Sequence, residues 1–292
     1  MIPLKPGPDM GLDTGPDTGQ TQESRDTMRD TTPSRAIIVL GGALSLLLAG
    51  CSTPPAPIKS DHLPDERLAL AAPPTAGLAA QADDERIFTR TRALRGTPRW
   101  TLAQSDADLR PAPFLRGFSC AAGFEIDTAK APALMNILAM MAKAETHRTS
   151  EEKHHWNRLR PFIGNEAPIC VARDGLLAKS PSYPSGHTIA GYSTALVLSA
   201  LLPERGAALL QRGRVIGESR IICGVHWASD VAAGYQAAGA FAVATLENPA
   251  IRALMPAARQ ELLAMQANAP RPDAARCAIE ADAAAHSPFS ED

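Results

Sequence analysis

The apolar residues of this chain recur at helical spacing in one segment after another, and this periodicity restricts the fold more than any other feature. Leu134, Ile137 and Met141 give the clearest case, because residues three and four positions apart share one face of a helix. The sequence predicts helices over the following ranges: 83–95, 131–146, 188–202, 207–223, 230–246 and 250–267. No segment shows the alternation with a period of two that marks a half-buried strand. We therefore predict an all-α fold.

Residues 188–202 form the most apolar of these segments, which raises the question of a membrane span. The segment lies between Gly186 and Pro203, and it is shorter than the roughly 20 residues that cross a bilayer. It also contains Thr188 and Ser193, so a buried core helix is favoured. Aromatic residues make up only 4% of the chain, which fits closely packed helices better than an aromatic-rich β-sandwich.

The N-terminal region has the composition of a leader followed by an export signal. Residues 1–27 are rich in Gly, Pro, Asp and Thr, so we expect a disordered leader without a core. Residues 28–50 then place Arg29 and Arg35 before an apolar run, which is the layout of a secretory signal. Because signals rarely begin so far from the start, the sequence favours Met28 as the true start of translation.

The end of the apolar run predicts a lipid anchor. Residues 48–51 read Leu-Ala-Gly-Cys and resemble a bacterial lipobox, in which Cys51 is lipidated and becomes the first mature residue. A plain signal peptide cleaved nearby and a short membrane anchor are the alternatives. The residue directly after Cys51 is Ser52 and not the aspartate that often retains lipoproteins in the inner membrane. This favours a periplasmic protein anchored to the outer membrane. The membrane would then be contacted only through this N-terminal lipid.

The rest of the chain divides into a tether, one domain and a tail. Residues 51–80 contain many Pro, Ala and Asp residues and suit a tether. The domain is expected at 81–268 and a C-terminal tail at 269–292. The cysteines beyond the anchor are Cys120, Cys170, Cys223 and Cys277. They allow two disulfides in three pairings, with buried free thiols as the alternative.

Polar residues of chemical interest form clusters between residues 153 and 230. The clusters are Lys153 to Arg160-Pro161, then Pro184-Ser185-Gly186-His187, then Ser219-Arg220 with His226 and Asp230. Lysine and arginine side chains offer the charge and the planar donors that match phosphate oxygens. Ser185 and Gly186 precede an apolar helix, whose N-terminal N–H groups form an anion site. We therefore expect Lys153, Arg160, Ser185, Gly186 and Arg220 to bind phosphate.

Two histidines complete the expected chemistry. His226 and Asp230 lie four residues apart, so on a helix the carboxylate would orient the imidazole as a nucleophile. His187 is expected to protonate the leaving oxygen as a general acid. This arrangement needs no metal and no cofactor. His154 and His155 are neighbours that point apart on a helix, so we interpret them as surface or supporting residues.

Each cluster alone has a simpler explanation. A Pro-Ser-Gly-His sequence is usually a turn into a helix. Lys153 and Arg160 could be solvated helix charges, and His226 with Asp230 could be an exposed surface pair. The ordered combination at restricted spacing is very unlikely to arise by chance.

These clusters match the three-part motif of the type 2 phosphatidic acid phosphatase superfamily, and the chain most resembles its bacterial class A non-specific acid phosphatases. Further matching segments are 160–162, 182–188, 219–231, 93–98 and 106–109. Pro181 departs from the glycine usual in that class. The resemblance implies a compact helical bundle with its active site between central helices. It also implies the roles given above for the eight site residues, from Lys153 to Asp230.

The resemblance further implies the reaction and the partners. The expected activity is hydrolysis of phosphate monoesters such as nucleotides, sugar phosphates and aryl phosphates, with broad specificity, at acidic pH and through a phosphohistidine. Transfer of the phosphate to an alcohol is a further expectation, and relatives suggest a homo-oligomer. The net charge of −2 and the lack of a basic stripe give no support for nucleic-acid binding.

Other functions remain open at this point. Integral-membrane lipid phosphatases share the motif but need several spanning helices. A vanadium-dependent haloperoxidase uses the same kind of oxyanion pocket. A surface lipoprotein that keeps the pocket without catalysis is the non-enzymatic alternative.

Overall fold

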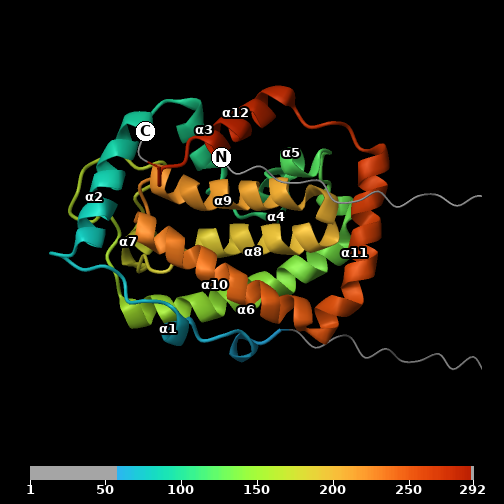
Figure 1. Ribbon diagram of the computed structural model, residues 1–292, viewed down its shortest axis with the longest axis horizontal. Coiled ribbons are helices and arrows are strands. Elements are labelled where there is room, and N and C mark those ends of the chain that lie inside the picture. The colour runs from blue at the N-terminus through green and yellow to red at the C-terminus, as the bar shows by residue number, and fades with distance from the viewer. Residues whose placement is uncertain (1–57, 291–292) are drawn as a thin grey trace, which may run out of the picture. The chain divides into compact units, whose positions relative to one another are not determined.

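The computed structural model describes residues 58–290 (Figure 1). The expected leader at 1–27, the signal at 28–50 and the lipidated Cys51 lie outside the described residues. Between residues 58 and 290 the secondary structure is helical without any strand, so the predicted all-α fold is confirmed. No helix in this part of the chain is long and apolar enough to cross a membrane.

Each of the helices that the apolar spacing predicts is present. They are α2 (Ala79–Thr91), α6 (Pro132–Trp156), α8 (Gly186–Leu201), α9 (Gly206–Ile222), α10 (Ala228–Glu247) and α11 (Pro249–Asn268). Short or terminal helices add to them: α1 (Glu66–Ala69), α3 (Pro98–Ser105), α4 (Pro111–Arg116), α5 (Ser119–Ala122), α7 (Gly175–Lys179) and α12 (Ala274–Ala285). The short helices escape prediction because four to eight residues carry too little apolar periodicity to be recognised.

Helix α8 occupies the centre of the bundle and packs closely against α9. Figure 1 shows the two helices side by side, with α10 and α6 on the other sides of α8. A Cβ atom at Gly191 would lie 2.6 Å from Ile216 Cγ2, and one at Gly213 would lie 2.5 Å from Ala195 Cβ. Only glycine permits this approach, so α8 and α9 meet backbone to backbone. The close packing holds the N-terminus of α8 near the C-terminal end of α9.

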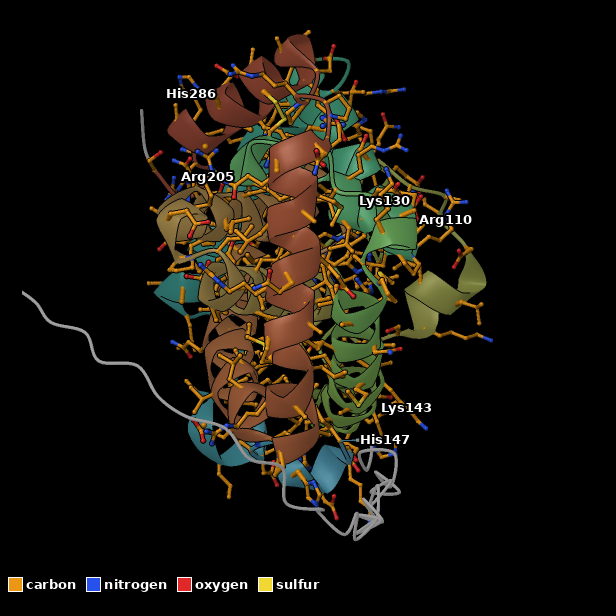
Figure 2. All side chains as sticks on the ribbon, turned by 90° about the vertical axis from the view of Figure 1, so that its right-hand side faces the viewer. Arg110, Lys130, Lys143, His147, Arg205 and His286 are labelled. Atoms are coloured by element: carbon orange, nitrogen blue, oxygen red, sulfur yellow. A yellow bond between two sulfur atoms is a disulfide. The ribbon has the colours of Figure 1, made fainter. Side chains whose placement is uncertain are left out.

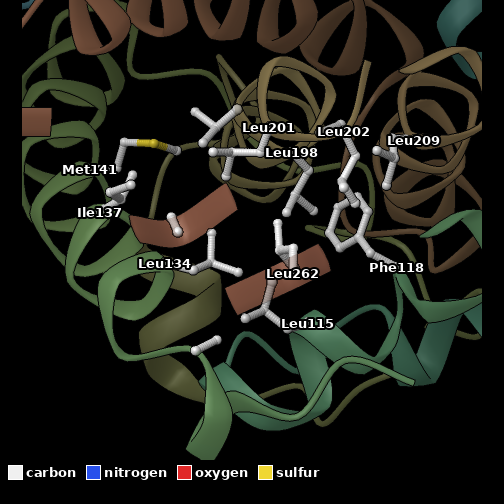
Figure 3. Packing of buried hydrophobic residues seen from close by; sticks show 14 of the residues in the cluster. Leu115, Phe118, Leu134, Ile137, Met141, Leu198, Leu201, Leu202, Leu209 and Leu262 are labelled. Carbon is white, nitrogen blue, oxygen red and sulfur yellow. The ribbon is translucent and has the colours of Figure 1, made fainter. Parts of the chain in front are cut away.

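The main core lies between α6, α8 and α11. Leu134, Ile137 and Met141 of α6 face Leu198 of α8 and Leu262 of α11 (Figure 3). All of these side chains are buried, and burial of each stabilises the fold by about 1.5–3 kcal/mol. On the opposite face of α6, Lys143 and His147 project into solvent (Figure 2).

The folded part extends further at both ends than the sequence predicts. Within the expected tether at 51–80, Ile58, Leu63 and Leu70 are buried, and Arg148 of α6 donates a hydrogen bond to the Leu63 carbonyl at 3.1 Å. In the expected tail at 269–292, Glu280 of α12 forms a buried ion pair with Arg212 at 3.2 Å. These segments attach through a few isolated anchors, which leave no periodic pattern in the sequence.

Disulfides join distant parts of the chain. Cys120 of α5 pairs with Cys277 of α12, and Cys170 pairs with Cys223 at the end of α9. The structure therefore selects one of the three pairings that the sequence leaves open. The first bond attaches α12 to the bundle. The second lies three residues before His226 and fixes the turn that carries it.

Candidate active site

Lys153 lies in the last turn of α6 and points toward the start of α8. Its ammonium donates hydrogen bonds to the carbonyls of Pro181 at 2.7 Å and Ser182 at 3.2 Å. A Cβ atom at Gly186 would lie 3.9 Å from Lys153 Cε, so the two residues are neighbours. Helix α6 ends directly afterwards because Asn157 has a φ of 46°, a left-handed conformation that terminates helices.

Arg160 lies in the irregular segment that follows α6 and is buried. Its Nε donates to the Ser180 carbonyl at 2.8 Å, and its Nη1 donates to the Val225 carbonyl at 2.8 Å. The same Nη1 lies 3.1 Å from Nε2 of His226. The two residues are 66 positions apart in the chain, so the fold brings the first and third clusters together.

His226 and Asp230 interact, although not as residues on one helix. His226 precedes α10, and Asp230 is the third residue of that helix. Asp230 Oδ2 accepts a hydrogen bond from the Trp227 backbone N–H at 2.8 Å and lies 3.3 Å from His226 Nδ1. The predicted proximity is present, but it results from the chain turning back over the helix N-terminus, where a carboxylate caps free N–H groups.

The contacts of His226 determine its tautomer. An arginine guanidinium can only donate, so Nε2 of His226 must carry the lone pair that faces Arg160. The proton of the neutral ring is then on Nδ1, directed at the Asp230 carboxylate. The nitrogen with nucleophilic character therefore faces the cationic side chains.

Arg220 lies near the end of α9 with unused hydrogen-bonding capacity. It is buried, and its Nε and Nη1 have no hydrogen-bond partner among the described residues. Buried guanidinium N–H groups nearly always find acceptors in a completed structure. Burial and the nearby charge of Arg160 lower the pKa of Arg220 to about 9, so it remains positively charged at acidic pH. These features are typical of a side chain that binds an anion.

The Pro-Ser-Gly-His cluster forms the N-terminus of α8, as the sequence predicts. Ser185 is the N-cap, and its hydroxyl accepts from the Thr188 N–H at 3.4 Å and from the Thr188 hydroxyl at 2.9 Å. His187 Nε2 lies 3.2 Å from the Ala107 carbonyl. Because a carbonyl only accepts, this nitrogen carries a proton and Nδ1 is left for a ligand.

The electrostatics of the site are dominated by uncompensated positive charge. Burial, together with the charges of Arg160 and Arg220, lowers the pKa of Lys153 to about 7. Burial lowers the pKa of His226 well below its usual value, and the charges of Arg160 and Lys153 act in the same direction. The pKa of His187 is also lowered well below its usual value, first by burial and then by the Arg220 charge. A dianion among these groups would reverse the charge contributions.

A second layer of buried charges, which sequence reasoning missed, supports Asp230. Arg158 Nη1 donates to Asp230 Oδ1 at 2.7 Å, and its Nη2 donates to Asp84 Oδ2 at 2.8 Å. Asp84 in α2 also accepts from the Ser229 N–H at 2.8 Å. Arg158 stands inside the first cluster, but its partner Asp84 is 74 residues away. No local spacing could have revealed that pairing.

His154 and His155 lie outside the site. His154 is exposed and bonds to the Ser150 carbonyl at 2.6 Å, and His155 packs against the ring of Trp156. Among residues 58–290, no group of three or more His, Cys, Asp or Glu side chains comes together as a metal site. The structure thus brings the three clusters together, through Lys153 beside Gly186, Arg160 beside His226 and His226 beside Asp230, with Ser185 engaged as a helix cap.

The amino-acid sequence is similar to those of known proteins. Residues 131–252 match the family described as the PAP2 superfamily. An acid phosphatase from Zymomonas mobilis is 41% identical over 247 residues, covering 84% of this chain and 94% of that protein. Non-specific acid phosphatases from Providencia stuartii and Salmonella typhimurium are 38% and 36% identical over 208 residues each. They cover 70% and 69% of this chain and 83% of each relative.

Solved structures also match this chain, one of them a membrane protein. It is a transmembrane PAP2 type phosphatidylglycerolphosphate phosphatase from Bacillus subtilis, with a TM-score of 0.43 and 18% identity. The match covers 58% of this chain and 86% of that one. The family assignment accordingly rests on the sequence relatives.

Proposed function

The chain belongs to the PAP2 superfamily, and we propose that it hydrolyses phosphate monoesters of varied structure through a phosphohistidine formed on His226. Its close relatives are acid phosphatases, and this chain is a phosphatase of the same kind, a phosphoric monoester hydrolase. The predicted family, fold and enzyme class are therefore confirmed. The haloperoxidase and the non-catalytic lipoprotein are not favoured by these relatives.

One observation carries the proposed mechanism. Arg160 Nη1 lies 3.1 Å from His226 Nε2, and besides burial the charges of Arg160, Lys153 and Arg220 lower the pKa of His226. Arg220 also presents buried N–H groups without acceptors. A phosphate group placed against Nε2 of His226 would supply acceptors and negative charge together. The backbone N–H groups of Gly186 and His187 at the start of α8 would add to the anion site.

The first chemical step is attack on phosphorus. Nε2 of neutral His226 forms a bond to phosphorus, and the bond from phosphorus to the ester oxygen breaks. Asp230 accepts a hydrogen bond from Nδ1–H and stabilises the ring as it gains positive charge, while the proton stays on the ring. His187, protonated on Nδ1, gives that proton to the ester oxygen, so the alcohol leaves in its neutral form.

The second step regenerates the enzyme. A water molecule gives a proton to His187 Nδ1 while its oxygen attacks phosphorus, and the bond to His226 Nε2 breaks. Phosphate then leaves the site, with His226 neutral and His187 protonated again. An alcohol in place of water would give phosphate transfer by the same route. Nucleotides, sugar phosphates and aryl phosphates are the substrates we expect.

The pKa of His187 explains why acidic conditions would favour this reaction. In the empty site its pKa lies well below the usual value, so the ring is neutral near pH 7. A bound phosphate dianion counteracts the three cations and raises the pKa of His187. The protonated fraction needed for the first step therefore falls as the pH increases, which predicts a decline of kcat on the alkaline side.

We also propose that the protein is exported and held at the outer membrane by lipid on Cys51. The disulfides between Cys120 and Cys277 and between Cys170 and Cys223 support an oxidising compartment. The described residues contain no helix that could span a membrane, which agrees with an anchor confined to the N-terminus. Homo-oligomerisation remains a prediction from relatives.

The test is an assay of the purified chain with a small aryl phosphate at mildly acidic pH in the presence of a metal chelator. We expect activity that the chelator leaves intact and vanadate inhibits. His226→Ala should lower kcat by at least about 10⁴-fold, while His155→Ala, a control at an exposed residue of α6, should keep the wild-type kcat. Labelled phosphate should be trapped on wild-type protein in alkali and absent from His226→Ala.

Two results would contradict the proposal. Phosphatase activity retained by His226→Ala would remove that residue as nucleophile. Halide oxidation with vanadate and peroxide, without phosphatase activity, would favour the haloperoxidase.

A further inference from the structure

An elongated groove of about 590 Å³ leads away from the phosphate site. Lys153, Gly186 and His187 form part of its lining, so the groove begins at the site itself. It continues between α6 and α8, with α4 along one side. The lining is mostly apolar and includes Pro111, Phe114, Leu115, Leu138, Ala142, Ile189 and Ala190.

The sequence of α6 and α8 produces this groove by helical spacing. Leu138, Ala142, Glu145, Thr149 and Lys153 all line it and follow each other at intervals of three or four residues, as one face of a helix requires. The stripe from Lys153 to Glu145 spans eight residues, or about 12 Å of helix. On α8 the small side chain of Ala190, one turn after His187, keeps the groove open.

The proposed mechanism determines which part of a substrate the groove would hold. Attacking and leaving atoms lie roughly in line across phosphorus, so the alcohol departs on the side opposite His226. His187, which protonates the departing oxygen, lines the groove, whereas His226, Arg160 and Arg220 are not among the described residues that line it. The groove therefore lies on the side where the alcohol leaves.

We propose that this groove is a binding site for the alcohol portion of the substrate and that, among the varied monoesters hydrolysed, it favours those of elongated, apolar alcohols. This inference rests on the proposed function, because it assigns the groove from the roles of His187 and His226. Such a substrate would place its phosphate against Lys153 and extend its chain along α6 toward Leu138. Nucleoside and sugar groups would bury less apolar surface against the walls of the groove, so they would gain less binding free energy from it.

Glu145 gives the groove a further property. Its side chain is buried, Oε2 accepts a hydrogen bond from Ser193 at 3.1 Å, and Oε1 has no partner among the described residues. Burial raises the pKa of Glu145 to about 8, so the carboxyl group is neutral under acidic conditions. A neutral carboxyl group is compatible with an apolar chain beside it, whereas an ionised one opposes it.

The test compares kcat/KM for ethyl, butyl, hexyl and octyl phosphate at mildly acidic pH, below concentrations at which they aggregate. Each added methylene that enters the groove should raise kcat/KM by about two- to fourfold. The octyl-to-ethyl ratio should therefore reach at least about fiftyfold. The gain should appear mainly in KM if the chain binds equally in the ground state and the transition state.

Two variants fill the groove from opposite walls. Ala190→Phe and Ala142→Phe should each lower the octyl-to-ethyl ratio at least about tenfold, and using both protects against the failure of one to fold. Ala200→Phe is the matched control, because Ala200 is exposed on the same helix α8 and is not among the groove's described lining residues. This control should keep the wild-type ratio.

The pH dependence gives an independent measurement. The octyl-to-ethyl ratio should fall as the pH rises through the pKa of Glu145, near 8, because a negative charge then appears among the apolar walls. Lys153 and His187, the other ionisable residues of the described lining, lie at the phosphate end of the groove and face both esters alike. In Glu145→Gln the ratio should not change over the same range.

The possible results distinguish a failure of the groove proposal from a failure of the proposed function. Hydrolysis of ethyl phosphate with no increase in kcat/KM from ethyl to octyl phosphate would refute the proposed role of the groove and leave the proposed function intact. An equal loss of the ratio in Ala200→Phe would also overturn it. Absence of hydrolysis with every ester, in a folded protein, would overturn the proposed function on which the groove depends.

Discussion

Replacement of Arg158 by methionine should damage both folding and catalysis, because this buried arginine joins α2 to the Asp230 carboxylate. It donates to Asp230 at 2.7 Å, to Ser229 at 2.7 Å, to Asp84 at 2.8 Å and to Gln81 at 2.7 Å. Methionine has a similar length and no charge. The variant therefore removes the donors while filling most of the space.

The magnitude follows from what is left behind. The side chains of Asp84 and Asp230 are 3% and 0% exposed, so the variant leaves buried carboxylates without their cation. Breaking a buried pair in this way lowers the free energy of unfolding by about 3–5 kcal/mol. A hydrogen bond to a charged group contributes about 1.5–3 kcal/mol. If the misoriented Asp230 stabilises the transition state by that much less, kcat falls about ten- to hundredfold.

A change in pH dependence distinguishes positioning from simple stability. Burial raises the pKa of Asp230, and the charge and hydrogen bond of Arg158 oppose that rise, so removing Arg158 raises the pKa further. Asp230 then becomes protonated at a higher pH, and His226 loses its anionic partner there. The acidic limb of the kcat profile should therefore move to higher pH in Arg158→Met. Arg158→Lys keeps the charge and should recover part of this shift.

The assay is kcat and KM for a small aryl phosphate across the pH range, together with urea unfolding of the same preparations. Arg252→Met is the matched control. Arg252 forms an exposed pair with Glu247 at 3.4 Å, with side chains 66% and 73% exposed, so its loss should change stability by less than about 1 kcal/mol. If Arg158→Met unfolds more easily but keeps the wild-type kcat and pH profile, Arg158 is structural only.

Three further outcomes are expected from the same structure. Burial raises the pKa of Glu152 to about 8, above its value in the unfolded chain, so the free energy of unfolding should decrease between pH 5 and pH 8. Glu152→Gln should weaken that pH dependence in urea titrations. The same pH dependence in the variant and the wild type would refute this prediction. Replacing both Cys170 and Cys223 by serine should destabilise the protein by about 2–5 kcal/mol and lower kcat, because the disulfide fixes the turn before His226. Calorimetry measures the change in stability and an activity assay the change in kcat. Full activity in the variant would contradict the predicted fall in kcat. Vanadate should raise the melting temperature of the wild type, and Arg220→Met should lose most of that rise, whereas an equal shift in both would exclude Arg220 from the anion site.

Much of the fold was predictable because long helices repeat their apolar residues. The segments around Leu134 and Thr188 carry enough turns for the spacing to be recognised. Helix α1 has only four residues, too few for a periodic pattern, and α12 is attached through the ion pair of Glu280 with Arg212 and the Cys120–Cys277 bond. Such anchors depend on partners elsewhere in the chain, so local sequence does not reveal them.

The residues proposed to carry the chemistry could be named from the sequence, because a phosphate group requires cations, N–H donors and histidines whatever the surrounding fold. The sequence also determined that Ser185 starts a helix, since capping depends on neighbouring residues only. Tertiary structure alone decided that His226 meets Asp230 through a turn rather than along a helix, and that Arg158 reaches Asp84. It also selected the disulfide pairing and opened the groove between α6 and α8. These features arise between segments far apart in the chain, where the distance between side chains depends on how the helices pack.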